Sequence, residues 1–219
     1  MINNIKESNK KYIIIYMRLR FNKNAEEIIK NSKFSIQELP YTISNETVLE
    51  IGMGKGSMLS ELAKNHPNIT YIGLEKYSTP AMSAIKKINE LQLNNMYILV
   101  ADAIELEKYF NGKFKTIWLT FSDPWPKKRH FKRRLVYRDF LKQYEKLLAE
   151  DGVIYFKSDN EGLYNYALEE LAEYQAKIIY KSEDFHNCDF NIENCFTDYE
   201  RKFYNEGKAI KFIAFSFQK

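Results

Sequence analysis

Short apolar runs alternate with amphipathic segments along residues 41–181 of this chain. Runs of strand length, which favour buried β-strands, occupy residues 47–51, 69–74, 96–100, 115–121, 153–156 and 177–180. Segments with helical spacing lie between the runs, at residues 58–64, 79–93, 138–149 and 161–173. This repeated alternation predicts an α/β fold, in which a parallel sheet carries helices on both faces.

The two ends of the chain have a different pattern. Residues 1–40 are polar, with one amphipathic helix predicted over residues 25–31, and we interpret them as an N-terminal extension or arm. Residues 41–219 form the main domain and close with an alternating apolar strand predicted at residues 209–217. A chain of 219 residues with 45% hydrophobic positions has enough apolar material for one domain core.

Charge and cysteine content narrow the class of protein. The formal net charge of +4 is too small to indicate a nucleic-acid partner by itself, because the distribution of charge matters more than its sum. Cys188 and Cys195 do not make a disulfide framework and lack paired metal-ligand spacing, so we expect reduced thiols, no metal site and a cytoplasmic protein. No apolar run approaches the ~20 residues that span a bilayer, so no membrane association is expected.

A glycine-rich turn follows the first predicted strand. Gly52, Gly54 and Gly56 have the spacing G-x-G-x-G, whereas the dinucleotide fingerprint needs its third glycine where Ser57 stands. Glu50 precedes the turn, and its carboxylate would repel phosphates but attract a cationic ligand. Both features disfavour a nicotinamide cofactor and favour S-adenosylmethionine, which carries an ammonium and a sulfonium but no phosphate.

Two more acidic residues stand at the ends of the next two predicted strands. Glu75 is placed to accept hydrogen bonds from both ribose hydroxyls, and Asp102 to accept one from the adenine amino group. Any one such acid could simply cap a helix. Three acids at three successive strand ends, where ligands bind in open α/β sheets, together indicate an S-adenosylmethionine site.

The fourth predicted strand ends in a stiff loop followed by a cluster of cations. Trp125 lies between Pro124 and Pro126, and such a loop can hold the Asp123 carboxylate in a fixed position. Six of the eight residues from 127 to 134 are lysine or arginine, with His130 and Phe131 among them. Cations collected beside a presumed active site predict a phosphate-binding surface, and aromatic side chains among them could stack on bases.

The run FSDPWPKKRHFKRRL, residues 121–135, resembles the signature of the bacterial tRNA (guanine-N7)-methyltransferases. Five further segments occur in that family's order, namely LEIGMGKG at 49–56, GLEK at 73–76, VADA at 100–103, KSDN at 157–160 and TDYE at 197–200. The resemblance implies a Rossmann-like class I methyltransferase fold, with a mostly parallel seven-stranded sheet and an antiparallel C-terminal strand. It also implies S-adenosylmethionine as cofactor and tRNA rather than DNA as partner, with N7 of guanine 46 in the variable loop as the methylated atom.

The resemblance assigns roles to individual positions. The cofactor contacts would be the loop glycines and four acids, Gly52, Gly54, Gly56, Glu50, Glu75, Asp102 and Asp123, with Asp123 also the catalytic acid. The substrate contacts would be Lys127, Asp159, Thr197, Asp198, Tyr199 and Glu200. The RNA-interacting segment would be Arg129, His130, Phe131, Lys132, Arg133 and Arg134.

Several points stay open at the level of sequence. Guanine N7 carries a free lone pair, so catalysis should rest on alignment and electrostatics, and either Asp123 or Asp159 could fix the guanine. Ser158 stands where the family often has threonine, and Asp198 where it often has a longer acid or lysine. The TDYE segment also fits a helix start, with Thr197 as N-cap and Glu200 at the third position.

Two other functions fit parts of this sequence less well than methylation of guanine N7 does. The first rival is an enzyme that methylates exocyclic amines of bases, but such enzymes usually have two adjacent prolines in this loop, whereas Trp125 separates the two prolines here. The second rival is an RNA-binding protein that has lost catalysis, which is disfavoured because all four acids of the predicted cofactor site are present. The segment Met17-Arg18-Leu19-Arg20 resembles the start of family members, so residues 1–16 are expected to be an upstream extension. The oligomeric state is left open.

Overall fold

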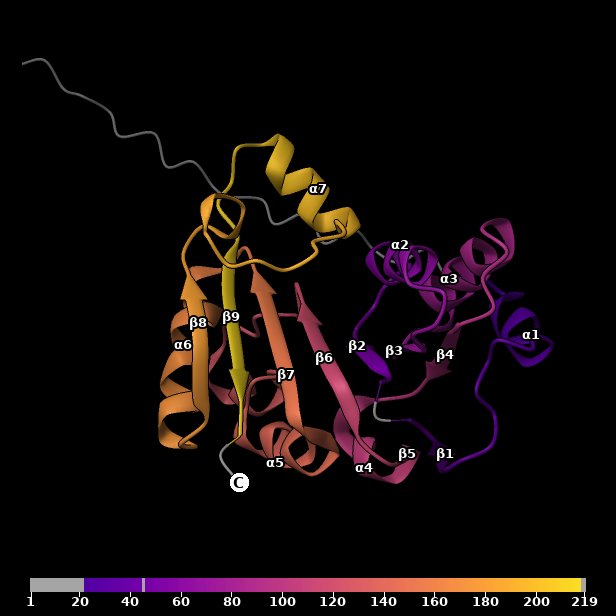
Figure 1. Ribbon diagram of the computed structural model, residues 1–219, viewed down its shortest axis with the longest axis horizontal. Helices are drawn as coiled ribbons and strands as arrows, with labels where there is room; N and C mark the ends of the chain where they lie inside the picture. The colour runs from indigo at the N-terminus through magenta and orange to yellow at the C-terminus, as the bar shows by residue number, and fades with distance from the viewer. Residues whose placement is uncertain (1–21, 45, 218–219) are drawn as a thin grey trace, which may run out of the picture.

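The computed structural model describes residues 22–44 and 46–217. The hypothesis about residues 1–16 and the segment beginning at Met17 concerns positions outside this described part of the chain. A seven-stranded sheet forms the centre of the described molecule, with helices on both sides (Figure 1). Its strands, in chain order, are β2 (Val48–Ile51), β3 (Tyr71–Glu75), β4 (Met96–Val100), β6 (Phe114–Thr120), β7 (Leu148–Ser158), β8 (Lys177–Ser182) and β9 (Lys211–Ser216).

The strand order across this sheet is β4-β3-β2-β6-β7-β9-β8. β4, β3, β2, β6 and β7 pair in parallel, whereas β9 pairs antiparallel with both β7 and β8. The predicted mostly parallel sheet with an antiparallel C-terminal strand is therefore confirmed. The chain moves outward from β2 to β4 and then returns to place β6 on the other side of β2, so the topological switch point lies between β2 and β6.

Seven α-helices and three short 3-10 helices connect these strands in the described chain. The α-helices are α1 (Ala25–Lys30), α2 (Ser57–Asn65), α3 (Ser78–Glu90), α4 (Leu106–Tyr109), α5 (Arg138–Leu147), α6 (Glu161–Glu173) and α7 (Asp198–Asn205). The 3-10 helices are η1 (Ala103–Glu105), η2 (Lys128–Arg133) and η3 (Phe185–Asn187). In the part of the chain that the structure describes, no helix is long and apolar enough to cross a membrane.

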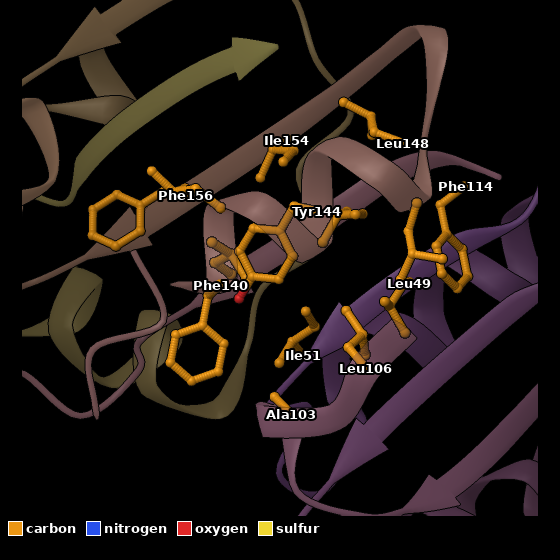
Figure 2. Close-up of a cluster of buried hydrophobic side chains, with 14 of the residues drawn as sticks. Leu49, Ile51, Ala103, Leu106, Phe114, Phe140, Tyr144, Leu148, Ile154 and Phe156 are labelled. Atoms are coloured by element: carbon orange, nitrogen blue, oxygen red, sulfur yellow. The ribbon is translucent and has the colours of Figure 1, made fainter. Parts of the chain in front are cut away.

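Neighbouring side chains of the strands supply two hydrophobic layers, one on each face of the sheet. Leu49 and Ile51 of β2 contribute to the layer under α4, α5 and α6, where Phe140 and Tyr144 fill the space beside them (Figure 2). Val48 of β2 contributes to the opposite layer, which is formed with α2 and α3. Apolar burial on both faces explains why the parallel strands are nearly continuous apolar runs in the sequence.

The element boundaries differ from the sequence prediction in a few places. The helix predicted over residues 138–149 ends at Leu147, because Leu148 already pairs with Phe114 at the start of β7. A two-stranded sheet of β1 (Tyr41–Thr42) and β5 (Phe110–Asn111) was not predicted, since its two short strands carry no periodic signal. Cys188 and Cys195 are both free thiols.

The described part of the predicted N-terminal arm belongs to the domain core. α1 packs on α3, and Ile29 and Phe34 are buried in the layer formed with α2 and α3. Ser35 forms a parallel bridge to Ile98 at the β4 edge of the sheet. A domain boundary at residue 40 therefore does not coincide with a break in packing, since residues 25–36 contribute apolar side chains to the same core.

Candidate active site

Glu50 lies on β2, next to the switch point of the sheet, and its side chain is buried. Thr120, at the end of the neighbouring β6, donates a hydrogen bond of 2.7 Å to Oε1 of Glu50. Oε2 is also buried and has no hydrogen-bond partner among the described residues. Burial raises the pKa of Glu50 to about 7, against the Thr120 hydrogen bond and the charge of Lys157, which lower it. Because Oε2 is buried without a hydrogen-bond partner, Glu50 can accept a hydrogen bond from a cationic donor.

The glycine loop begins directly after β2. Gly52 and Gly54 have φ angles of +77° and +58°, which side chains rarely adopt, and a Cβ atom at either position would meet no atom within 4 Å. At Gly56 a Cβ atom would lie 2.9 Å from the Cβ of Ala84, so this glycine lets the start of α2 approach α3. The first two glycines thus shape the turn and leave open space above it, whereas Gly56 serves packing.

Glu75 ends β3 beside this loop. Its carboxylate accepts backbone hydrogen bonds of 3.0 Å from Gly54 and 3.0 Å from Tyr77, so the loop and the acid hold each other. Burial raises the pKa of Glu75, the backbone hydrogen bonds lower it, and the nearby charge of Asp123 raises it further. The charge of the Asp123 loop therefore acts on the carboxyl at the end of β3.

Asp102 follows β4, and both oxygens of its carboxylate already accept hydrogen bonds within the protein. It caps η1 by accepting a hydrogen bond of 3.2 Å from the Ile104 N–H. Its other oxygen accepts one of 2.7 Å from the Lys76 ammonium. The cap and the ion pair therefore hold the side chain that was predicted to meet an adenine amino group.

The Asp123 loop is held in a strained shape. Phe121 and Trp125 have φ angles of +50° and +42°, which are unusual for aromatic residues and typical of functional positions. The Phe121 N–H donates a hydrogen bond of 2.9 Å to the Lys157 carbonyl, which fixes the loop to the end of β7. Asp123 lies between the two strained residues and its side chain is exposed.

Arg134 braces the same loop from behind. Its Nε donates to the Pro124 carbonyl at 3.0 Å, its Nη2 donates to the Trp125 carbonyl at 3.2 Å, and its guanidinium lies over the Tyr166 ring. The guanidinium N–H donors of Arg134 are thus used for contacts inside the protein. We therefore expect Arg134, predicted from sequence as an RNA contact, to act mainly by shaping the loop.

The other cations of the cluster lie on η2 and its flank. Arg133 covers the Trp125 ring, with 4.9 Å between the guanidinium carbon and the ring centroid. Desolvation and the neighbouring cations Arg133, Arg129 and Lys127 lower the pKa of His130, so its ring is neutral near pH 7 and does not add charge. The exposed members of the predicted cluster are Lys127, Lys128, Arg129, Phe131, Lys132 and Arg133.

The segment TDYE forms the start of α7, above the carboxyl ends of β6 and β7 (Figure 1). Thr197 is the N-cap and accepts a hydrogen bond of 3.0 Å from the Glu200 N–H, which confirms the predicted helix start. Asp198 accepts a hydrogen bond from the Ser57 hydroxyl. Tyr199 is 51% exposed and stacks on Phe121, with ring centroids 6.4 Å apart and 25° between the planes. Since Phe121 is two positions before Asp123 in the chain, the stacked rings lie beside the loop that carries this carboxylate.

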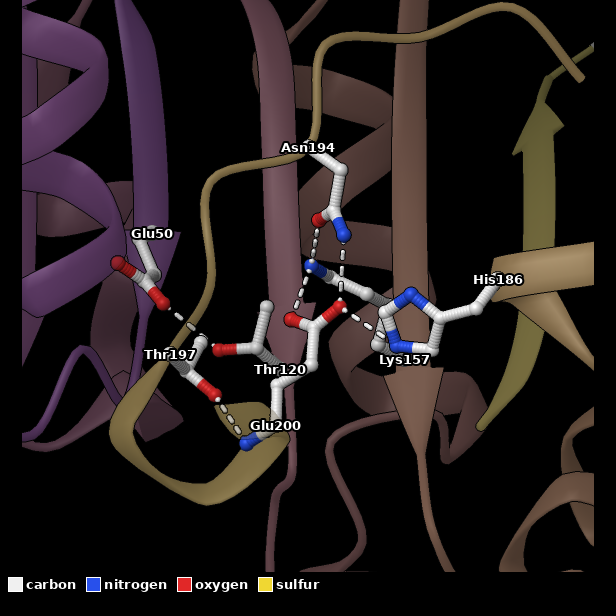
Figure 3. A network of polar contacts seen from close by, with 7 residues as sticks. All are labelled: Glu50, Thr120, Lys157, His186, Asn194, Thr197 and Glu200. Carbon is white, nitrogen blue, oxygen red and sulfur yellow. Dashed lines mark hydrogen bonds and ion pairs between the residues drawn. The ribbon is translucent and has the colours of Figure 1, made fainter. Parts of the chain in front are cut away.

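Glu200 differs from its neighbours because its side chain is fully buried. It forms an ion pair of 2.7 Å with Lys157, which is also fully buried (Figure 3). The substrate contact by Glu200 stays a prediction, and in this structure its carboxylate has no exposed surface and is occupied by Lys157 and Asn194. Its role in this structure is to hold the start of α7.

Asp159 follows β7 and is partly exposed. Its carboxylate forms an ion pair of 2.6 Å with Lys208, so a substrate group would share or displace that lysine. Ser158, one of the departures from the family pattern, accepts a hydrogen bond of 3.0 Å from the Asn160 N–H. A threonine hydroxyl would make the same bond, so this substitution leaves the turn intact.

Three residues of this site, Thr120, Lys157 and Asn194, were not predicted from the sequence. Thr120 lies inside the strand predicted at residues 115–121, and Lys157 opens the KSDN motif directly after the strand predicted at residues 153–156, so neither was given a role of its own. Lys157 carried a signal, since a lysine directly after Phe156 in a buried run needs a partner. Asn194 comes from the irregular segment before α7 and had no local signal.

The sheet order, the glycine loop at the switch point and the acids at the strand ends define a Rossmann-like methyltransferase. A sequence family described as "Putative methyltransferase" matches residues 44–213. A tRNA (guanine-N(7)-)-methyltransferase of Metamycoplasma hominis is 61% identical over 201 residues, which cover 92% of this chain and 100% of that protein. A tRNA (guanine-N(7)-)-methyltransferase of Mycoplasmopsis pulmonis is 47% identical over 93% of this chain and 100% of that protein. The chain belongs to the tRNA (guanine-N7)-methyltransferase family.

Solved structures agree with this fold. An antibiotic-related methyltransferase superposes with a TM-score of 0.59 at 18% identity, covering 87% of this chain and 91% of that one. PKMT2 from Rickettsia typhi in complex with AdoHcy superposes with a TM-score of 0.56 at 13% identity, over 80% of this chain and 49% of that one. At such low identity these likenesses extend to the fold alone.

The donor set at the switch point fits the methyl donor that this fold implies, S-adenosylmethionine. Glu50 offers a buried carboxylate oxygen without a partner, which suits an ammonium group. The space above Gly52 and Gly54 lets a ligand approach the backbone closely. Glu75 lies beside that space, with lone pairs beyond the two that accept from the backbone. Asp102 fits less well, because Lys76 neutralises its charge.

Proposed function

We propose that this protein transfers the methyl group of S-adenosylmethionine to N7 of a guanine in tRNA, at position 46 of the variable loop. The observation that carries the proposal is the convergence of Glu50, Glu75 and the Asp123 loop at one end of the sheet, beside the cations of η2. The family relationship supports both the reaction and the class of substrate. We expect the protein to act in the cytoplasm, where tRNA is found.

S-adenosylmethionine supplies a methyl group on a positively charged sulfur, which the lone pair of guanine N7 can attack directly. Glu50 would accept the cofactor ammonium through its free oxygen, and Glu75 would accept the ribose hydroxyls. Because positive charge passes to the purine, a carboxylate near the base stabilises the transition state more than the ground state. Asp123, exposed on a braced loop, is the candidate for that role, and no proton needs to be removed before attack.

Asp159 is the second candidate for fixing the guanine. Its carboxylate lies at the end of β7, and Lys208 holds it in place. A carboxylate that accepts the N–H groups of guanine would select the base, whereas one that faces the developing charge would accelerate the transfer. The two roles predict different kinetic defects, so variants of Asp123 and Asp159 separate them.

The exposed cations of η2 would bind tRNA phosphates. Lys128, Arg129 and Lys132 lie on one short helix next to the Asp123 loop, so bound phosphates would be held near the site of chemistry. The neutral ring of His130 and the exposed ring of Phe131 would contribute contacts other than charge.

The test is methyl transfer from labelled S-adenosylmethionine to unmodified tRNA, followed by digestion and identification of the labelled nucleoside. Label in 7-methylguanosine is expected, with kcat/KM lowered about 100- to 1,000-fold by Asp123→Ala. A raised KM for tRNA at nearly normal kcat in Asp159→Asn would assign guanine recognition to that residue. Label in another nucleoside would overturn the proposed target, and a protein that does not bind S-adenosylmethionine would overturn the proposed reaction.

A further inference from the structure

Lys157 is a fully buried cation near the carboxyl end of β7, directly before Ser158. Its ammonium donates hydrogen bonds of 2.7 Å to Glu200 and 2.8 Å to the Asn194 side chain. It also lies over the rings of Trp118 and Phe185, at 5.1 and 5.4 Å from their centroids. No role of this lysine follows from the reaction described above.

The partners of Lys157 form a closed network around Glu200 (Figure 3). The Asn194 amide donates a hydrogen bond of 2.9 Å to Oε1 of Glu200, while its carbonyl oxygen accepts from Lys157. His186 approaches the same carboxylate oxygen at 3.4 Å. Lys157, Asn194 and Glu200 each bond to the other two, so the network ties the start of α7 to β7.

A buried ion pair is a costly way to hold a helix. Removing two charges from water costs several kcal/mol each, and apolar residues of similar volume often hold a structure equally well. The anchoring of α7 therefore does not by itself explain a charge at position 157. An additional electrostatic role for the ammonium accounts for it better.

Glu50 is the group that such a charge would serve, because Thr120, which donates a hydrogen bond of 2.7 Å to Glu50, is the register partner of Lys157 where β6 pairs with β7. The charged groups that act on it from the surrounding elements are Lys157 on β7, Glu75 on β3 and Glu200 on α7. Lys157 is the one cation among them. It lowers the pKa of Glu50, and its effect is larger than that of Glu75 or of Glu200 taken singly, each of which raises the pKa. Burial lowers the pKa of the Lys157 ammonium. The negative charges of Glu200 and Glu50 both raise that pKa, and Glu200 has the stronger effect.

We propose that Lys157 is a positioning residue for both sides of the reaction: through Glu200 it fixes the start of α7, and it supplies the counter-charge that favours the ionised form of Glu50, which accepts the cofactor ammonium. This inference rests on the proposed function, because it assigns the ammonium of S-adenosylmethionine to Glu50. Lys157 itself stays buried and touches neither substrate.

The experiment compares cofactor binding with and without this buried charge. S-adenosylhomocysteine, which carries the same amino group but no transferable methyl, is titrated calorimetrically into the full-length protein between pH 5 and 7.5. Wild type is expected to bind more weakly as the pH falls below about 7, where Glu50 gains a proton. In Lys157→Met/Glu200→Met the loss begins at higher pH, so that affinity at pH 7 is about threefold to tenfold weaker than in wild type.

Thr197→Ala is the matched control for the anchoring of α7. It removes the cap of α7 but leaves Lys157 and Glu200 in place, so it should raise the KM for tRNA without moving the pH at which S-adenosylhomocysteine affinity falls. The ligand control is 5′-methylthioadenosine, which lacks the amino acid part and should bind every variant with the same pH profile. An unchanged S-adenosylhomocysteine profile in a folded double variant, or an equal change in Thr197→Ala, overturns the counter-charge role.

Circular dichroism melting checks that the double variant folds. Should it not fold, Lys157→Gln/Glu200→Gln keeps hydrogen-bonding groups in the network and makes the same comparison. Wild-type protein that does not bind S-adenosylhomocysteine at any pH would overturn the proposed function and this inference with it. Binding with a pH profile that does not depend on Lys157 would overturn the inference alone.

Discussion

The hydroxyl of Ser57 donates a hydrogen bond of 2.6 Å to the carboxylate of Asp198, joining residues 141 positions apart. Ser57 begins α2, directly after the glycine loop, and Asp198 begins α7. The Lys87 ammonium also donates to the Ser57 hydroxyl, which brings α3 into the same contact. This bond links the side of the site that we assign to the cofactor with the side that we assign to tRNA.

Removing that link should weaken tRNA binding more than chemistry. Ser57→Ala and Asp198→Ala are each expected to raise the KM for tRNA about 2- to 5-fold, because an exposed hydrogen bond to a charged group contributes about 0.5–1 kcal/mol. The double variant should show no further loss, since both changes remove one interaction. Steady-state kinetics checks this, with Ser83→Ala on α3, whose hydroxyl bonds to the Thr79 carbonyl of its own helix, as the control. Fully additive effects would contradict a direct link.

The buried carboxyl of Glu50 should destabilise the protein without cofactor at neutral pH. In the folded protein burial raises its pKa from 4.5 to about 7, so the folded state keeps a proton that the unfolded chain loses. Stability therefore falls as the pH rises through this window, and the full penalty is present above pH 7. Glu50→Gln should increase the free energy of unfolding at pH 8 by up to about 3 kcal/mol, and by little at pH 4.5.

Urea denaturation at the two pH values measures this effect, with Glu61→Gln, an exposed acid on α2, as the control. The same Glu50 variant should lose affinity for S-adenosylhomocysteine. A Glu50 variant that is less stable than wild type at pH 8 would show that ionic contacts, rather than burial, dominate the environment of this carboxyl.

Alanine substitutions of Arg134 and Arg129 should cause different kinetic defects, although both residues belong to the cation cluster. Arg134→Ala removes the donors to two loop carbonyls, so we expect a lower melting temperature and a lower kcat. Arg129→Ala removes an exposed cation, so we expect a higher KM for tRNA and a salt dependence whose slope is reduced by about 1. Kinetics at several salt concentrations, together with melting curves, separate the two. Identical profiles would place both arginines on the RNA surface.

Tyr199 should contribute through its ring rather than its hydroxyl. If its face and that of Phe121 receive a base, Tyr199→Ala should raise the KM for tRNA about tenfold, since stacking contributes about 1–3 kcal/mol per base. Tyr199→Phe should be nearly normal. Tyr204→Ala is the control, because that ring is equally exposed on α7 but packs against His186 and Phe196. Equal losses in both alanine variants would point to the helix rather than to stacking.

The strands and most helices were predictable because their signal is local. Burial on both faces requires continuous apolar runs in the parallel strands, and the helix at residues 161–173 has the predicted bounds. Short elements without periodicity, such as β1 and β5, escaped prediction. Residues 25–36 were interpreted as an arm because their buried side chains are few and their partners lie on α3 and β4.

The candidate site was predictable to the level of which residues stand at strand ends, because a parallel sheet brings those ends to one edge. What each side chain does there was not predictable. Arg134 acquires its role from Pro124 and Trp125 carbonyls presented by a strained loop. Asp102 is neutralised by Lys76, and that pairing depends on how β3 and β4 lie side by side.

The sequence by itself determined the class of fold, the glycine loop and the order of acids along the chain, since these follow from periodicity and from motifs within a few residues. Only the tertiary structure decided which charges are free and which are paired. Lys157 and Glu200 are 43 residues apart, yet both are buried in one ion pair. Burial and distance set the cost and the strength of a charge interaction, and both quantities exist only once the chain has folded.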